Sequence, residues 1–63
     1  MKNKPEVKLL GENGNIFNLL GIACSALEKE NLKAEAKELR SKIFSCGSYD
    51  EALQLIMQYC DVV

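Results

Sequence analysis

The fold of this chain is decided by residues 16–43, which read IFNLLGIACSALEKENLKAEAKELRSKI. Apolar residues recur at helical spacing from Ile16 to Leu27. A second apolar stripe follows, consisting of Leu32, Ala36, Leu39 and Ile43. At about 100° per residue the second stripe points roughly 180° away from the first, so one continuous helix would need a core on two opposite sides. The sequence therefore predicts a break near Glu30 and Asn31, with Asn31 as the N-cap of the second helix.

The first helix is expected over residues 15–29 and the second over residues 31–44. Asn15 is the expected N-cap of the first helix, because its side chain can accept a hydrogen bond from a free N–H group of the first turn. Gly47 is the expected stop of the second helix, because glycine readily adopts the left-handed backbone that ends many helices. These signals predict two helices separated by a break near Glu30 and Asn31.

The third helix is expected over residues 48–60. Ser48 followed by Glu51 has the form of a capping box, in which both side chains satisfy free N–H groups at the helix start. The residues expected on its buried face are Tyr49, Ala52, Leu53, Ile56, Tyr59 and Cys60. The pattern predicts a helix that packs against the first two.

Short extended segments are expected at both ends of the sequence. Residues 7–10 alternate partly in polarity and stop at the strong turn signal of residues 11–14, Gly-Glu-Asn-Gly. Residues 61–63 carry two valines, and residues 7–10 are the obvious strand for them to pair with. The sequence therefore predicts a single small domain over residues 1–63, mainly α, in which three helices are closed by a small two-stranded sheet pairing residues 7–10 with 61–63.

The charge and the cysteine content indicate which cellular compartment and which kinds of partner to expect. The chain holds 8 basic and 9 acidic residues, a net charge of −1, so no overall field draws it to nucleic acid or to an anionic membrane. No apolar run reaches the roughly 18 residues that a membrane span needs, and the charged N-terminus lacks the apolar stretch of a secretory signal. Three cysteines without a close pair are typical of reduced thiols. We therefore expect a cytoplasmic protein without a membrane partner.

Few side chains suit catalysis. No histidine is present, which excludes a Cys–His pair, a histidine-containing serine triad and a histidine-containing metal site. Cys24 and Cys60 fall on the expected core faces, where a thiol behaves as a small apolar group. Cys46 is expected in the loop before the third helix, and it is the only one of the three cysteines in a position that suits a reactive thiol. We expect a protein that is not an enzyme and that uses no cofactor and no metal.

Two stretches resemble a known group of proteins. The first is residues 7–17, VKLLGENGNIF, followed by Gly21. The second consists of Gly47, Ser48, Tyr49, Asp50, Leu53, Met57, Asp61 and Val62. Together they are similar to the shared segments of short uncharacterised bacterial proteins, some linked to phages and other mobile elements. Asn13 and Ser48 stand where the resemblance leads us to expect an acidic residue. The resemblance supports the fold and implies no activity.

The width of the third helix's apolar face is the best functional lead. Leu55 and Met57 lie at its two margins and widen the stripe to about 200°. One helix of a small domain does not easily bury so much, so these side chains predict a surface for self-association or for another protein. The alternative is that neighbouring elements cover them. We expect a small non-enzymatic interaction module that forms a homo-oligomer.

A basic stripe offers the alternative function. If the second helix extends back to Lys29, four basic side chains fall within about 80° of one another, namely Lys29, Lys33, Lys37 and Arg40. Such a stripe could contact an acidic partner or a nucleic-acid backbone, the latter as in an accessory nucleic-acid-binding or regulatory protein of a mobile element. The competing interpretation is a solvated helix face, since Glu35 and Glu38 share the helix. Nucleic acid is therefore the less favoured partner.

Overall fold

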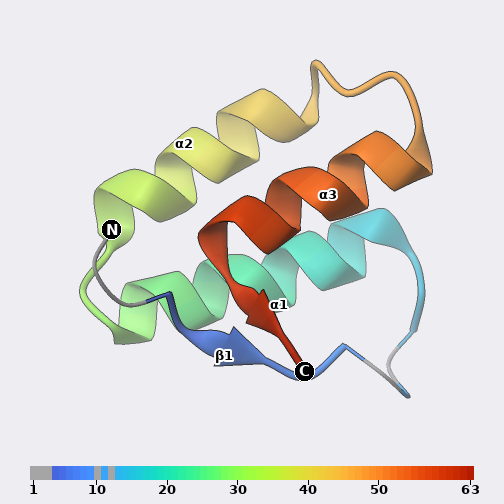
Figure 1. Cartoon of the computed structure of the whole chain (residues 1–63). Coiled ribbons are helices and arrows are strands. Elements are labelled where there is room, and N and C mark those ends of the chain that lie inside the picture. Colours follow the sequence, from blue (N-terminus) through green and yellow to red (C-terminus); the bar gives the residue numbers. More distant parts are fainter. Residues whose placement is uncertain (1–3, 10, 12) are drawn as a thin grey trace.

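The structure is a computed structural model that describes residues 4–9, 11 and 13–63. Within this part of the chain, three helices and a small two-stranded sheet form the fold, so the predicted class is confirmed (Figure 1). In chain order the elements are β1 (Glu6–Val7), α1 (Ile16–Lys29), α2 (Lys33–Ile43), α3 (Tyr49–Tyr59) and β2 (Asp61–Val62). None of the helices in the described ranges has both the length and the apolar character needed to cross a membrane.

Asn15 caps α1, as predicted. Its backbone is extended, with φ −61° and ψ 130°, and its side chain accepts a hydrogen bond from the N–H of Phe17 at 2.9 Å. The side chain of Asn13 in turn accepts a bond from the N–H of Asn15 at 3.0 Å. Two amide side chains therefore satisfy N–H groups that a helix start would otherwise leave unpaired.

The chain reverses where the two apolar stripes predict a break, but the role predicted for Asn31 is wrong. Asn31 has φ 63° and belongs to the end of α1, where its N–H donates to the Glu28 carbonyl at 3.0 Å. The N–H of Leu32 donates to the Leu27 carbonyl at 2.8 Å. These two bonds form a Schellman motif, and asparagine tolerates the left-handed backbone that the motif requires. α2 then begins at Lys33, and no side chain makes a capping hydrogen bond there.

The prediction that Gly47 stops the second helix is also wrong. α2 ends at Ile43, and its last carbonyls are satisfied within the next turn. The N–H of Ser45 donates to the Lys42 carbonyl at 3.0 Å, and the N–H of Cys46 donates to the Ile43 carbonyl at 3.2 Å. Gly47 follows this turn and has no positive φ, so it does not end α2 in the left-handed conformation that was expected.

The predicted capping box starts α3. The Ser48 hydroxyl accepts a hydrogen bond from the N–H of Glu51 at 3.2 Å. The Glu51 carboxylate accepts one from the N–H of Gly47 at 3.4 Å, one residue before the N-cap. The box therefore ties the start of α3 to the loop that precedes it.

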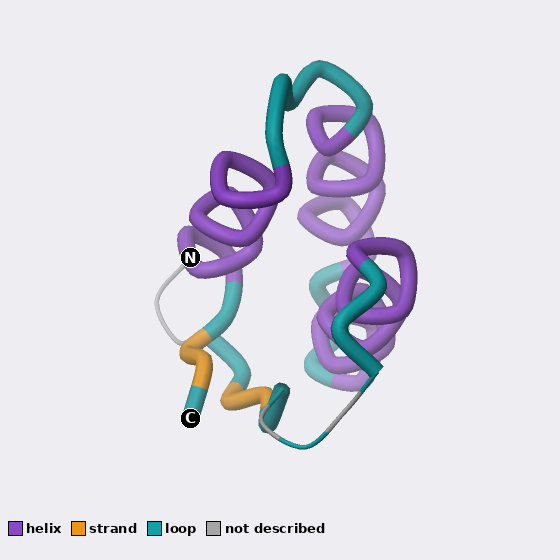
Figure 2. Tube along the Cα trace, turned by 90° about the vertical axis from the view of Figure 1, so that its right-hand side faces the viewer, coloured by secondary structure: helices purple, strands orange, loops and turns teal. Residues whose placement is uncertain are grey.

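The two strands lie side by side in the lower part of Figure 2 and run parallel. In their register, Glu6 lies beside Asp61 and Val7 beside Val62. The predicted pairing of the two ends is confirmed, but β1 begins one residue earlier than expected and does not include Lys8 or Leu9. Leu10, also predicted in this strand, lies outside the described residues.

The core lies where the three helices meet the sheet. Leu27, Leu39 and Ile56, one from each helix, are completely buried there. Cys24 and Cys60 are buried beside them, as their spacing predicted. The buried apolar residues of the described chain are Val7, Leu19, Leu20, Ala23, Cys24, Leu27, Ala36, Leu39, Ile43, Ala52, Ile56, Tyr59 and Cys60. Val7 brings β1 onto this cluster, so the sheet closes one side of the helix bundle.

Candidate partner surface

Six large apolar side chains are exposed in the described part of the chain. Their exposed fractions run from 36% for Val62 to 71% for Phe44. The full set is Phe17, Phe44, Tyr49, Met57, Val62 and Val63. The expectation that Tyr49 is buried is wrong, because half of its surface is exposed.

An aromatic pair lies at one end of the bundle. Phe17 is in the first turn of α1, and Phe44 is the C-cap of α2. Their ring centroids lie 6.2 Å apart, and the two ring planes are inclined at 41°. Tilted pairs at this separation are favourable. The two rings line a hollow whose other wall includes Tyr49 and the half-buried Cys46. All three exposed aromatic side chains of the described residues line this hollow.

Tyr49 joins the aromatic end to a second hollow. Its hydroxyl donates a hydrogen bond to the Gly14 carbonyl at 2.6 Å, which fixes the ring between α3 and the loop before α1. Its side chain lines the aromatic hollow and also the second hollow. The described residues that line the second hollow are all uncharged: Leu9, Gly14, Leu19, Tyr49, Leu53, Val62 and Val63.

Leu53 continues this surface along α3. It lines the second hollow and also a third, which Met57 shares on the outer face of the helix. Tyr49, Leu53 and Met57 follow one another at four-residue steps and therefore lie on one side of α3. We call the connected surface the apolar belt; it consists of Phe17, Phe44, Tyr49, Leu53, Met57, Val62 and Val63.

Leu55 and Met57, the two residues predicted to contact a partner, are not brought together. Two positions apart on a helix, their side chains project about 200° apart. Leu55 is half-buried and packs against the core, whereas Met57 is 49% exposed on the apolar belt. The partner role of both residues stays a prediction, and only Met57 has the exposure that it requires.

The basic stripe is divided between two helices. Lys29 is the last residue of α1, and the chain reverses before α2, so the continuous helix on which the stripe depends is absent from the structure. The remaining members are exposed on α2: Lys33, Lys37 and Arg40. The same helix carries Glu38, whose carboxylate lies 3.9 Å from the ammonium of Lys42. Nucleic-acid binding by the stripe stays a prediction.

Burial lowers the reactivity of two thiols. Removal from water raises the pKa of the Cys60 thiol to about 11 and also raises the pKa of Cys24. Their thiols donate to the carbonyls of Ala23 and Ala36, at 3.9 and 3.6 Å respectively. Cys46 is half-buried in the loop before α3. Among the residues that the structure describes, no cluster of three or more His, Cys, Asp or Glu side chains is placed to hold a metal ion.

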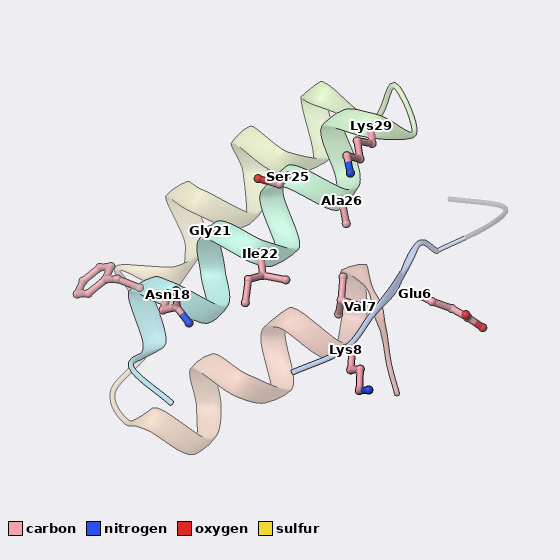
Figure 3. Close-up of a pocket in the computed structure, with 10 residues that line it drawn as sticks. Glu6, Val7, Lys8, Asn18, Gly21, Ile22, Ser25, Ala26 and Lys29 are labelled. Carbon is pink, nitrogen blue, oxygen red and sulfur yellow. The ribbon is translucent and has the colours of Figure 1, made fainter. Parts of the chain in front are cut away.

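The sequence reasoning missed a groove between α1 and β1 (Figure 3). Gly21 and Ser25, which line the groove on the α1 side, have small side chains or none. A Cβ added at Gly21 would meet no atom within 4 Å. Charges of both signs line the groove, from Glu6, Lys8 and Lys29. The four-residue spacing of two small residues on the exposed side of α1 is the signal that could have indicated it.

The stretches that resemble short bacterial proteins contribute most of the apolar belt. Phe17 comes from the first stretch, and Tyr49, Leu53, Met57 and Val62 come from the second. The resemblance itself stays a prediction. Comparisons with protein-family models, with curated proteins and with solved structures find no match to this chain.

Proposed function

We propose that this protein is a small non-enzymatic interaction module that associates with itself through the apolar belt. The supporting observation is that all six exposed large apolar side chains of the described residues line three hollows, which are joined through the shared residues Tyr49 and Leu53. Single apolar side chains scattered over a surface are normal for a monomer. A contiguous apolar patch is typical of an interaction site.

Self-association also suits the size of the chain. A domain of about 60 residues buries only about 60% of the surface of its unfolded chain, so its stability is marginal. Removing apolar surface from water contributes about 25 cal/mol per Å². Covering side chains such as Phe44 and Met57 in an oligomer therefore stabilises both the assembly and the fold of each copy.

Sedimentation equilibrium over a wide concentration range under reducing conditions tests the proposal. We expect the wild type to form a dimer or a higher species. Met57→Asp places a charge in the belt, and we expect its dissociation constant to rise at least about tenfold, equivalent to about 1.4 kcal/mol, with helix content unchanged.

Ser41→Asp is the matched control for charge. Ser41 is exposed on α2 and lines none of the hollows of the apolar belt. The same added charge at this position should leave the dissociation constant unchanged. A wild type that stays monomeric at every concentration contradicts the proposal.

The alternative function is nucleic-acid binding through the basic stripe. A DNA-binding measurement distinguishes it from self-association. It requires a retarded complex with duplex DNA at low salt that Lys33→Glu with Lys37→Glu abolishes. We expect no such complex, because the net charge is −1 and Glu35 and Glu38 interrupt the cations of α2. A complex lost in the double variant would favour the alternative.

We also propose that the protein works in the cytoplasm. The supporting observation is that Cys24, Cys46 and Cys60 are all free thiols, which a reducing compartment maintains. Fractionation of cells that produce the protein tests this proposal. Recovery of a disulfide-linked form from an oxidising compartment would contradict it.

A further inference from the structure

We infer that the second copy docks along the outer edge of β2. The two β2 strands then pair antiparallel about a two-fold axis, and the two small sheets join into one sheet of four strands. This inference rests on the proposed self-association and adds the geometry of its contact. Its evidence is the backbone of β2 and the chemistry of the surface beside that strand.

β2 has one paired edge and one outer edge. The N–H of Asp61 donates to the Pro5 carbonyl at 2.9 Å. The N–H of Val63 donates to the Val7 carbonyl, also at 2.9 Å. Because these alternate residues face β1, the residue between them, Val62, directs its N–H and C=O to the opposite edge. The parallel register with β1 therefore uses neither group, and outside the ladder neither makes a hydrogen bond to a backbone group of the described residues.

Among the described helices and strands, only β1 and α3 contact β2. α1 packs against β1, whereas α3 packs against β2, so β2 is the strand farther from α1 (Figure 2). Val62 and Val63 are both exposed there. An exposed strand edge with unpaired N–H and C=O groups is a ready template for a strand of another chain.

The edge is complementary to itself. Two residues directly opposite in an antiparallel pair can exchange two N–H···O bonds, and a two-fold axis places Val62 of one copy opposite Val62 of the other. Asp61 then lies opposite Val63, so the two Asp61 carboxylates do not face each other. Each Asp61 carboxylate also lies 3.8 Å from the ammonium of Lys4 in its own chain.

The surface beside the edge favours a second copy over a charged partner. The described side chains that line the adjoining hollow are all uncharged. A two-fold axis sets identical groups near one another, which is unfavourable for charges and favourable for apolar side chains. A standard interface buries about 800 Å² per partner, about a fifth of the 4307 Å² that this chain exposes. The hollow beside β2 shares Tyr49 with the aromatic hollow that reaches Phe44, so the apolar belt extends the contact toward the bundle end.

Cross-linking tests the strand pairing directly. A hydrogen-bonded antiparallel pair holds its two Cα atoms about 5.5 Å apart, which suits a disulfide. The test variant is Val62→Cys, in a Cys46→Ser background that removes the native thiol nearest the surface. On mild oxidation we expect a linked dimer to form at least about tenfold faster than with Ser41→Cys in the same background, because that thiol lies outside the belt.

Val62→Pro removes the outward N–H with little change to the fold. That N–H takes no part in the bonds to β1, so we expect an unchanged far-ultraviolet circular dichroism spectrum. The dimer dissociation constant should rise at least about tenfold, since both copies lose a donor. Val62→Thr is the matched control, because it keeps the N–H and the β-branched shape, and its dimer should persist.

The outcomes separate this inference from the proposed function. A wild-type dimer whose Val62→Cys form cross-links no faster than the Ser41→Cys control overturns the strand pairing and leaves self-association standing. A wild type that is monomeric at every concentration overturns both. If Val62→Pro does not fold, the two cross-linking rates decide the matter alone.

Discussion

At the scale of single residues, Tyr49 contributes to both the fold and the proposed interface. Its ring is exposed on the apolar belt, while its hydroxyl donates to the Gly14 carbonyl at 2.6 Å. The bond joins α3 to the loop before α1 across 35 positions of the sequence. The polar tip and the apolar ring of one side chain can therefore be tested separately.

Tyr49→Phe removes the hydroxyl and keeps the ring. We expect the free energy of unfolding to fall by about 1 kcal/mol, because the Gly14 carbonyl loses its partner. Urea denaturation measures this change, and sedimentation should show an unchanged dissociation constant. An unchanged urea midpoint would mean that the Tyr49–Gly14 bond does not contribute to stability in solution.

Burial of the titrating side chains predicts that stability falls at alkaline pH. Burial raises the pKa of the Cys60 thiol from 9.0 to about 11, and it also raises the pKa values of Cys24 and Tyr59. The folded state holds these protons more tightly, so the stabilisation is complete below pH 9 and is lost as the pH rises toward 11. For Cys60 the loss amounts to about 2–3 kcal/mol.

Urea midpoints at pH 8 and pH 10.5 measure this alkaline loss. The control is Cys60→Ala, which removes the largest shift, so its stability should fall less steeply over the same range. A slope equal to that of the wild type would show that Cys60 does not titrate as its burial predicts.

At the scale of the elements, the end of α1 depends on the backbone of Asn31. Its φ of 63° lies in the left-handed region, and the two Schellman bonds require it there. Without the left-handed backbone at this position, the Leu27 and Glu28 carbonyls would lose the partners that reverse the chain into α2. The stripes of the two helices can face one core only because of this reversal.

Asn31→Val tests the reversal. A β-branched residue pays about 1–2 kcal/mol for the left-handed backbone, so we expect the free energy of unfolding to fall by that amount. Asn31→Gly adopts this backbone freely and should leave stability equal or higher. Thermal unfolding of both variants provides the measurement. Equal losses in both would instead implicate the Asn31 side chain.

At the scale of the whole molecule, the apolar side chains of the described residues fall into two groups, those buried in the core and those exposed on the apolar belt. The core takes residues from all three helices and from β1, and the apolar belt gathers the large side chains that remain exposed. Leu55 and Met57 are only two positions apart in the sequence, yet Leu55 packs against the core and Met57 is exposed.

Leu55→Asp and Met57→Asp should therefore differ. Leu55 packs against the core, so we expect Leu55→Asp to lower the free energy of unfolding by about 2–3 kcal/mol and to reduce helix content. Met57→Asp should weaken association and leave helix content unchanged. Circular dichroism and sedimentation on both variants give the comparison. A Leu55→Asp variant with full helix content and weaker association would move Leu55 from the core to the interface.

The sequence by itself determined the parts of the structure that depend on near neighbours. The spacing of apolar residues predicted three helices and the break between the first two, because a helix repeats every 3.6 residues. Asn15 and Ser48 were predicted as caps because a cap bonds N–H groups two or three residues away. The roles predicted for Asn31 and Gly47 were wrong. Each residue lies in a short link between two helices, and the sequence does not show which backbone carbonyls in that link still need a hydrogen-bond donor.

Only the tertiary structure decided which apolar side chains remain exposed. Phe17 and Phe44 lie 27 positions apart in the sequence and meet because α1 and α2 are antiparallel. Met57 and Leu55 separate because the core covers only one margin of α3. The outer edge of β2 exists because β1 pairs with its other edge. Exposure is set by contacts between residues far apart in the chain, and local periodicity carries no information about which of two apolar margins another element will cover.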